Sequence, residues 1–457
     1  MAAQRRIDLV LDSVKRLLRI GATANLLNLL QKQHPADLGQ IFSELADKDR
    51  EATFSLLADR NGRLAMEGIS ELGPENGAAL LATRSAEEIA RLAQEIPSDD
   101  AAALIDYLPE QLSAAVLDLM RPKESGVVEN LLEYEEQTAG RIMNPHVFAL
   151  SEDMTVGEAI GELQGNRDVE MVFYLYVVDE RRHLVGVVSL RRLLLVSPET
   201  PLKRIMTTDL ISARVDMDQE EVARQVAAYN LLAIPVVDEE NKLVGIITVD
   251  DVIDVIKDEA TEDIYRLAGV SGDERVFTPA KESLRLRFPW LAINLGTAFV
   301  AAAVIAAFKN TVDAWTLLAV FMGVPGSMGG NAATQTLTVI VRGLALGELT
   351  WTNARKALFK EIIVGVGNGF ANGLIAGVVV WLFRSDPMIA VLLFVSMIVN
   401  LFVAGAAGTL IPLGLKAMRA DPALGSTVFI TTFTDVAGLA SFLGLATMYL
   451  RMSGKAG

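Results

Sequence analysis

One acidic side chain lies deep inside an apolar stretch near the end of this chain. Asp435 follows four threonines within the stretch 424–450, and no lysine or arginine lies at a matching depth in any other apolar stretch. Carboxylates inside a membrane are rare, and one without a basic partner marks a cation pathway. Thr427, Thr431 and Thr434 share or adjoin the helical face of Asp435, because residues three and four apart lie on one side of a helix. The sequence therefore predicts a hydrated cation path beside Asp435.

A second group of chemistry-bearing residues is the run 250–270, in which acids crowd one predicted helix. Only Lys257 and Arg266 compensate them. Charge runs usually form solvated helix faces, but clustered carboxylates also repel one another until a divalent cation lies between them, which would make a switch. The sequence leaves both interpretations open. The acids are Asp250, Asp251, Asp254, Asp258, Glu259, Glu262 and Asp263.

Five apolar stretches could carry the cation path across a membrane, since a span needs about 20 predominantly apolar residues. The second stretch is rich in glycine, proline, amide and hydroxyl residues, which a span tolerates where backbone is buried in protein or lines a wet cavity. The third and fourth carry Asn368, Asn372 and Asn400, and Glu361 is expected at the membrane interface. The stretches are 289–308, 315–345, 358–383, 387–415 and 424–450.

Basic residues between the stretches predict their orientation, because cytoplasmic flanks carry the excess of lysine and arginine. Nine basic residues flank the stretches on the side of the large N-terminal part, against four on the other side (Lys309, Arg384, Arg451 and Lys455). We therefore expect a multi-pass protein of the cell (inner) membrane, with its N-terminal part in the cytoplasm and its C-terminus outside.

Composition excludes several other functions for the 457 residues. The chain has no cysteine, so disulfides, thiolate zinc sites and a cysteine nucleophile are excluded, and its three histidines lie far apart. Its formal charge of −16 argues against a nucleic-acid partner. Residues 281–457 carry 13 basic and 7 acidic side chains, hence +6, which leaves −22 on residues 1–280. No phosphate-binding GxxxxGK[ST] motif and no catalytic constellation occurs, so we do not expect an enzyme.

An internal repeat organises the middle of the chain. YVVDERRHLVGVVSLRRLL (176–194) aligns with PVVDEENKLVGIITVDDVI (235–253) at an offset of 59, and Met143 corresponds to Met206 at an offset of 63. Each copy is predicted to hold a helix, two strands around a charged turn and a second helix. This pattern resembles a tandem CBS pair, a regulatory module that often senses adenine nucleotides or ions.

The remaining soluble part is predicted to be all-helical, with short helices punctuated by proline and glycine that suggest a superhelical array. The fold class is thus a multidomain membrane protein with an all-α N domain, an α/β CBS pair and an all-α domain of five spans. The expected domains are the helical N domain 1–135, the CBS repeats 136–200 and 201–257, a connecting plug helix 258–284 and a transmembrane pore domain 285–457.

The whole chain resembles the MgtE family of magnesium transporters. The resemblance is carried by SMGGNAATQTLTVIVRGLALGE (327–348) and DPALGSTVFITTFTDVAGL (421–439), with support from HPADLGQIF (34–42) and IKDEATEDIYRLAGV (256–270). It implies a homodimer in a lipid bilayer, with a central pore that the cytoplasmic domains and the plug helix close when cytosolic Mg²⁺ is high.

The resemblance also implies roles for single residues. Asp435 would hold hydrated Mg²⁺, one copy from each subunit, and Asp99 would share a sensing ion with Asp251. Further pore-lining positions would be Gly329, Gly330, Asn331 and Thr334, in a loop and helix of the second span, and Thr427 and Thr431 in the fifth. Further sensor ligands would be Asp218, Glu220, Asp254, Glu259 and Glu262.

Four departures from the family pattern accompany these matches. Asn230 stands where a sensor aspartate is often found beside Glu220, and Ala333 replaces a frequent glycine. Thr334 and Thr427 stand where some members have asparagine, and Gly323 with Pro325 displaces the usual proline before the paired glycines.

The sequence predicts a Mg²⁺ channel-like transporter gated by cytosolic Mg²⁺. Two alternatives remain: a secondary transporter that couples Mg²⁺ or Co²⁺ to Na⁺ or H⁺, and a membrane-anchored CBS receptor for nucleotides. The choice among Mg²⁺, Co²⁺ and Mn²⁺, and the binding of ATP by the CBS pair, stay open.

Overall fold

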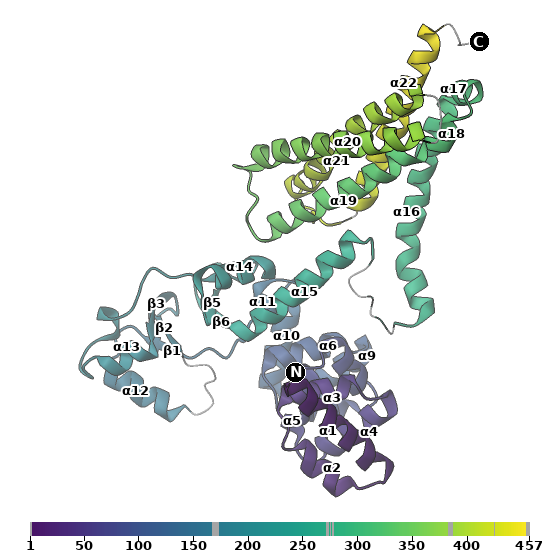
Figure 1. The fold of residues 1–457 in the computed structure, drawn as a ribbon. Coiled ribbons are helices and arrows are strands. Elements are labelled where there is room, and N and C mark those ends of the chain that lie inside the picture. The colour runs from purple at the N-terminus through teal and green to yellow at the C-terminus, as the bar shows by residue number, and fades with distance from the viewer. Residues whose placement is uncertain are drawn as a thin grey trace. The chain divides into compact units, whose positions relative to one another are not determined.

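The structure is a computed structural model that describes residues 2–166, 173–270, 274, 276, 278–382, 387–424 and 426–453 (Figure 1). Arg384 and Lys455, which entered the predicted orientation, lie outside these residues. The chain divides into two compact units, Met1–Ile256 and Lys257–Gly457.

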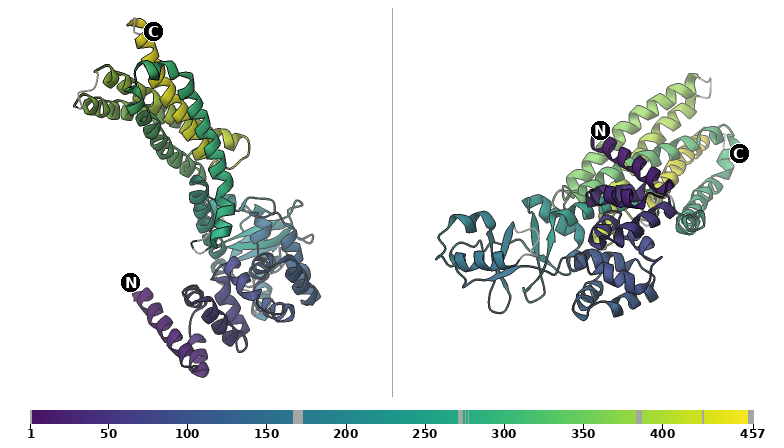
Figure 2. Two further views of the ribbon diagram at one scale, coloured as in Figure 1. Left: turned by 90° about the vertical axis from the view of Figure 1, so that its right-hand side faces the viewer. Right: turned by 90° about the horizontal axis from the view of Figure 1, so that it is seen from below.

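The first unit begins with a stack of short helices (Figures 1 and 2). Several start with a proline, which has no N–H and so removes one of the unpaired donors of the first turn, as at Pro35, Pro74 and Pro122. Helices that are two positions apart in the chain pack together: α3 on α5, α6 on α8, α7 on α9 and α8 on α10. This packing confirms a helical N domain. They are α1(Ala2–Arg19), α2(Thr23–Leu30), α3(Pro35–Ser43), α4(Asp47–Ala58), α5(Gly62–Ser70), α6(Pro74–Leu81), α7(Ala86–Ala93), α8(Ser98–Asp106), α9(Glu110–Leu119), α10(Pro122–Glu133) and α11(Ala139–Ile142).

The two repeat copies form two three-stranded sheets with the same register. In one, Tyr174 pairs with Ser189; in the other, Ala233 pairs with Thr248, 59 residues later in both strands. Each sheet also has a short parallel strand that the pattern did not predict. The elements are β1(Ala149–Ser151), α12(Val156–Gly165), β2(Tyr174–Val178), β3(Leu184–Ser189), α13(Leu190–Leu195), η1(Leu202–Arg204), β4(Ala213–Arg214), α14(Gln219–Tyr229), β5(Ala233–Val237), β6(Leu243–Thr248) and α15(Val249–Leu267).

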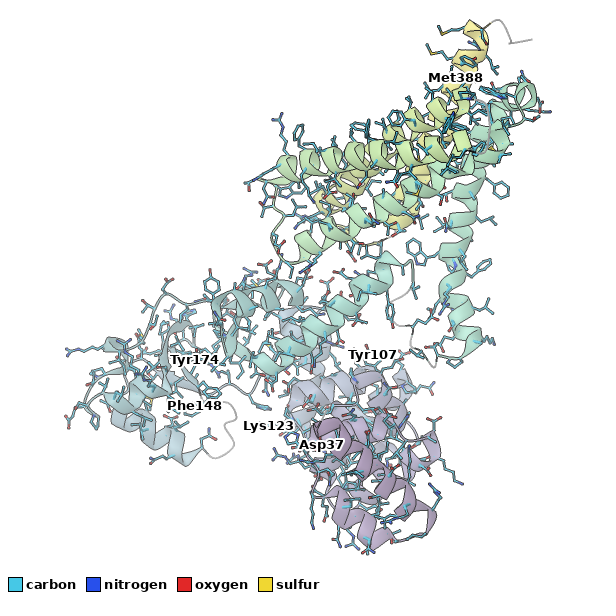
Figure 3. All side chains as sticks on the ribbon, viewed as in Figure 1. Asp37, Tyr107, Lys123, Phe148, Tyr174 and Met388 are labelled. Carbon is cyan, nitrogen blue, oxygen red and sulfur yellow. The ribbon has the colours of Figure 1, made fainter. Side chains whose placement is uncertain are left out.

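The segment that precedes each repeat copy packs against the sheet of the other copy. A Cβ on Gly245 would lie 2.7 Å from Sδ of Met143, and a Cβ on Gly186 would lie 2.5 Å from Sδ of Met206. Each methionine therefore occupies the space that a glycine of the other copy leaves open. Phe148 packs against the apolar cluster around Leu175, and Tyr174 packs against the cluster around Tyr176 (Figure 3). The two equivalent sheets agree with the predicted CBS pair.

The second unit is a bundle in which α21 is central. It packs against α19, α20 and α22, and α16 packs against α22 (Figures 1 and 2). Met388 packs on the apolar cluster around Phe442 at one end of the bundle (Figure 3). The helices are α16(Ala280–Ala307), α17(Lys309–Ala314), α18(Leu318–Phe321), α19(Gly323–Ala345), α20(Ala354–Leu382), α21(Pro387–Ala417) and α22(Ser426–Met452).

Four of these helices are long and apolar enough to cross a membrane within the described ranges: α16, α20, α21 and α22. The glycine, threonine and amide residues of α19 lower its hydropathy, so the predicted count of five spans is not confirmed by length and composition. The fold class itself, a multi-pass membrane protein with a helical N domain and a CBS pair, is confirmed.

Glycines set the close approach of α20 to α21. A Cβ on Gly369 would lie 2.7 Å from Cα of Ile398, and one on Gly373 would lie 2.9 Å from the Phe394 carbonyl oxygen. Gly365 meets the Leu401 carbonyl at still closer range. Small residues four apart let two membrane helices touch backbone to backbone, so α21 is held in one place against α20.

Candidate ion pathway and cation sites

Asp435 is a half-buried carboxylate on α22. Among the described residues it makes no hydrogen bond or ion pair, and its neighbour on α19 is the backbone of Gly326, where a Cβ would lie 3.2 Å from Oδ1. One turn earlier on the same face, a Cβ on Gly330 would lie 3.6 Å from Cγ2 of Thr431. The structure thus brings together two groups that the sequence predicted separately, the glycines of α19 and the Thr431–Asp435 face of α22.

The threonine hydroxyls on α22 donate to their own helix. Thr431 donates to the carbonyl of Thr427 at 2.9 Å, and Thr434 donates to that of Thr431 at 3.0 Å. A hydroxyl that donates its proton to a backbone carbonyl still has lone pairs that can accept a hydrogen bond. Thr431, which is partly exposed, can therefore accept from the water shell of a cation beside Asp435, whereas Thr434 is fully buried in the bundle.

The glycine-rich segment of α19 is helical, and not the loop that the family resemblance implied for its first part. The helix begins at Gly323, so Pro325 lies in the first turn, where its missing N–H has no helical partner to lose. Asn331 and Thr334 lie on the exposed face of this helix, and Thr334 donates to the Gly330 carbonyl at 3.0 Å.

The hydroxyl of Thr427 makes a hydrogen bond that the sequence did not predict. Its hydroxyl donates to the carbonyl of Leu267, the last residue of α15, at 2.5 Å. The neighbouring Arg266 forms ion pairs with Asp421, just before α22, and with Glu262. Glu262 is therefore an ion-pair partner in this structure, and the end of α15 is fastened at the start of α22.

Burial and the charges of Asp421 and Glu259 raise the pKa of Asp263 to about 6. Asp263 adjoins the Arg266 ion pairs in sequence, and Arg266 offsets part of this effect. At the end of α15, Arg266 therefore offsets only part of the effect of burial and of the neighbouring carboxylates on Asp263.

Glu361, which the sequence placed near the membrane interface, is buried against neighbouring helices. It accepts a hydrogen bond from Thr336 on α19 at 3.1 Å and an ion pair from Lys360 at 2.5 Å. Only 4% of its surface is exposed because Gly405 of α21 lies against its backbone. The carboxylate therefore joins α19 to α20.

In the first unit the structure brings Asp99 and Asp251 together. Asp99 lies in the first turn of α8 and Asp251 in that of α15. Burial and the charge of Asp251 raise the pKa of Asp99 to about 8. Burial also raises the pKa of Asp251 to about 6, although Thr248 donates to it at 2.6 Å.

Neutral hydrogen-bonding side chains lie near the Asp99–Asp251 pair. The amide of Asn144 donates to Asp99 at 3.4 Å, and the Ser98 hydroxyl lies 3.1 Å from Nε2 of His146. No group of three or more histidine, aspartate or glutamate side chains with metal-binding geometry occurs among the described residues. Any cation here would keep several water ligands.

The other predicted sensor residues belong to two helices, α14 and α15, and the charge of Asp254 adds to the effect of burial in raising the pKa of Asp251. Asp218 caps α14 by accepting from the backbone N–H of Glu220 at 2.8 Å, whereas Asn230 ends the same helix with a φ of 52°. The helix has 11 residues, so Glu220 and Asn230 are separated by about 15 Å. Asp254 and Glu259 lie on α15.

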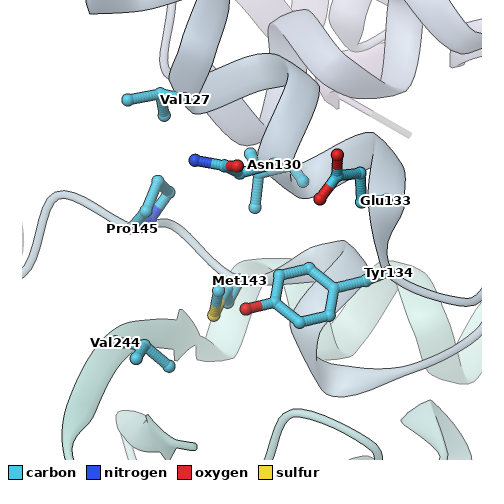
Figure 4. A pocket seen from close by; sticks show the side chains of 8 residues that line it. Val127, Asn130, Glu133, Tyr134, Met143, Pro145 and Val244 are labelled. Carbon is cyan, nitrogen blue, oxygen red and sulfur yellow. The ribbon is translucent and has the colours of Figure 1, made fainter.

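A cavity of about 400 Å³ lies between α10 and the second CBS copy (Figure 4). It is lined by Asn130, Tyr134, Met143 and Val244, among others, and by none of the predicted sensor residues. Burial, with the charges of Asp238 and Glu133, raises the pKa of Tyr134.

Sequence reasoning missed two features of the membrane unit. The glycines of α20 recur every fourth residue at 365, 369 and 373, which is a readable signal for helix contact. Asn400 was noted only as a polar residue, yet it is fully buried and bonded to α19.

Family models match most of the chain. A model described as a divalent cation transporter matches residues 322–445, one described as the MgtE intracellular N domain matches 33–137, and the CBS domain model matches 139–199 and 202–258.

Relatives match over nearly their full length. The magnesium transporter MgtE of Thermus thermophilus is 36% identical, over 96% of this chain and 98% of that protein. The magnesium transporter MgtE of Bacillus subtilis is 32% identical, over 95% of this chain and 96% of that protein. The crystal structure of the cytosolic domain of the Mg²⁺ channel MgtE in complex with ATP is similar at 38% identity and a TM-score of 0.50, covering 54% of this chain and 99% of that one.

Proposed function

Because the chain belongs to the MgtE family of magnesium transporters, we propose that it is a Mg²⁺ channel-like transporter that cytosolic Mg²⁺ closes, with Asp435 as the ion site. The observation that carries the proposal is the Asp435 carboxylate, which has no ion pair among the described residues and lies beside the Gly326 backbone. Mg²⁺ dehydrates reluctantly and is held by one or two carboxylates together with its waters. One carboxylate beside the partly exposed Thr431 hydroxyl fits that requirement.

A homodimer is supported by the surface of α19. Asn331 and Thr334 are exposed in a single chain, yet amide and hydroxyl groups at membrane depth usually face protein or a wet cavity. A second copy facing α19 and α22 would enclose the path and supply a second Asp435. The N-terminal domains would then lie in the cytoplasm of a cell (inner) membrane, with the C-terminus outside.

Gating would act through the acids of the first unit. Burial and the charge of Asp251 raise the pKa of Asp99, and burial raises the pKa of Asp251. A cation between the two carboxylates would therefore stabilise the compact form by mass action. Asp218, Glu220, Asp254 and Glu259 would be further ligands, including between copies. Millimolar Mg²⁺ should then protect residues 1–275 from protease, and an unchanged digestion pattern would remove the sensor role.

The CBS pair would bind ATP, because the similar crystal structure is that of an MgtE cytosolic domain in complex with ATP. The site would lie in the CBS pair, whose fold is common to both.

The test of the ion site is Mg²⁺ uptake by liposomes that contain the purified full chain. Asp435→Ala and Asp435→Asn should lower uptake by at least about tenfold, because no second carboxylate is expected at this depth. Thr432→Val is the matched control on α22, since its hydroxyl only bonds the Val428 carbonyl. Wild-type uptake in a folded Asp435→Asn protein would contradict the assignment.

The same liposomes separate the alternatives. A channel passes Mg²⁺ at constant pH without Na⁺ and does not saturate, whereas a coupled transporter requires the gradient of its partner ion. A receptor would bind nucleotide and pass no Mg²⁺. Parallel uptake of Co²⁺ and Mn²⁺ would define the ion preference.

A further inference from the structure

Asn400 is a fully buried amide in the middle of α21. Its Nδ2 donates to the Pro325 carbonyl of α19 at 2.5 Å. A carbonyl only accepts, so the nitrogen must face Pro325 and the orientation of the amide is determined. Its Oδ1 is buried and has no hydrogen-bond partner among the described residues.

Two glycines make room for this amide. A Cβ on Gly329 of α19 would overlap Nδ2 of Asn400, and a Cβ on Gly438 of α22 would lie 2.8 Å from Nδ2 and 3.0 Å from the backbone nitrogen of Gly326. The amide therefore fills the point at which α19, α21 and α22 meet.

This point adjoins Asp435. Gly438 lies one turn after Asp435 on α22, and the carbonyl that Asn400 binds belongs to the residue before Gly326. Gly326 is in turn the backbone beside Oδ1 of Asp435. The amide thus holds the segment of α19 that faces the carboxylate.

Other buried polar side chains of α21 do not reach across. Ser396 donates to the Leu393 carbonyl at 2.9 Å and Thr409 to the Gly405 carbonyl at 2.9 Å, both within α21. All three residues are 0% exposed, so burial alone does not distinguish Asn400 from them. Its bond to another helix does.

We propose that Asn400 is a positioning residue for ion discrimination: by binding the Pro325 carbonyl, it sets the distance between the Gly326 backbone and Asp435. This inference rests on the proposed ion site at Asp435. Selectivity depends on cavity size and rigidity, because Mg²⁺ is smaller than Ca²⁺ and demands a stricter geometry. Release of the Pro325–Gly326 segment should admit the larger ion.

The experiment measures the ratio of Ca²⁺ to Mg²⁺ uptake by liposomes that contain the full chain. Asn400→Ala removes the donor and leaves a small cavity, whereas Asn400→Leu removes it and fills the space with an apolar side chain of the same branching. Both should raise the ratio by about fivefold or more. Ser396→Ala is the control, with the ratio of the wild type. A role in stability alone would lower the yield of folded protein without changing the ratio.

Gly329→Ala tests the same contact from the other helix. Its methyl group would displace the amide, so the ratio should rise as in Asn400→Ala. The double variant Gly329→Ala/Asn400→Ala should match Asn400→Ala, because the two changes remove one interaction. Additive effects, or a wild-type ratio in a folded Asn400 variant, would overturn the inference.

The same data distinguish failure of this inference from failure of the proposed function. If the wild type itself passes no Mg²⁺, the transport assignment fails. If the wild type and Ser396→Ala pass Mg²⁺ while the Asn400 variants keep the wild-type ratio, only the positioning role is wrong.

Discussion

The backbone of Gly326 lies so close to the Asp435 carboxylate that a Cβ there would be 3.2 Å from Oδ1. A distance of 3.0–3.4 Å is tighter than most Cβ contacts, so a methyl group would push the carboxylate aside or narrow the space beside it. The proposed ion site therefore depends on a residue without a side chain as much as on the acid.

Gly326→Ala should reduce Mg²⁺ uptake by about fivefold or more, because small displacements at a binding group have large effects on rate. Gly323→Ala is a matched control three residues earlier on α19, where a Cβ would meet nothing within 4 Å. Liposome uptake measures both. Equal uptake by the two variants would show that the approach to Asp435 has no role in permeation.

Release of the end of α15 should hold the channel open at higher Mg²⁺. Arg266→Gln removes the ion pair with Asp421, and Thr427→Val removes the bond to the Leu267 carbonyl. Each should raise the internal Mg²⁺ concentration that closes the channel by about twofold to tenfold, since one such contact contributes about 0.5–1.5 kcal/mol. Patch recording at stepped internal Mg²⁺ measures this concentration.

Arg214→Gln is the control for that experiment, because its ion pair with Asp216 is exposed and belongs to the first unit. An unchanged closing concentration in both the Arg266 and the Thr427 variants would mean that the end of α15 does not participate in gating.

Protons should compete with Mg²⁺ at the Asp99–Asp251 pair. Without a cation the pKa of Asp99 is about 8 and that of Asp251 about 6. Mg²⁺ requires the ionised forms, so its apparent affinity should rise between pH 6 and pH 8, by up to about tenfold per unit for each proton released. Protease protection, titrated with Mg²⁺ at each pH, measures the affinity.

The stability of the first unit in chelator should change in the opposite direction. A carboxyl whose pKa is higher in the folded than in the unfolded chain stabilises the fold below its unfolded pKa, and this contribution is lost as the pH rises through the folded value. Melting temperatures in chelator should therefore fall as the pH rises from about 4 to about 8. Asp99→Asn should flatten the upper part of this curve, and a slope unchanged by Asp99→Asn would assign it to other groups.

The sequence predicted those parts of the molecule that a period or an offset encodes. The offset of 59 predicted two equivalent copies, whose strands do pair in the same register, Tyr174 with Ser189 and Ala233 with Thr248, and hydropathy predicted the four long apolar helices. The acid without a basic partner could also be read from the sequence. What it could not supply was which helix faces Asp435, because that depends on glycines that permit contact without specifying a partner.

Glu361 and Asn400 illustrate the same limit. Each is polar in an apolar stretch, and each becomes buried because a glycine of a neighbouring helix, Gly405 or Gly438, lies against it. Burial of these side chains is a property of the helix packing. Composition could not show that Glu361 contacts both α19 and α21.

The reciprocal contacts of Met143 with Gly245 and of Met206 with Gly186 are one contact made twice. The CBS pair is thus an isologous interface fused into a single chain. Such an interface does not dissociate on dilution, because covalent linkage supplies an effective local concentration in place of the protein concentration. Neither copy is a complete folding unit, so damage confined to one of them would dismantle the regulatory module as a whole.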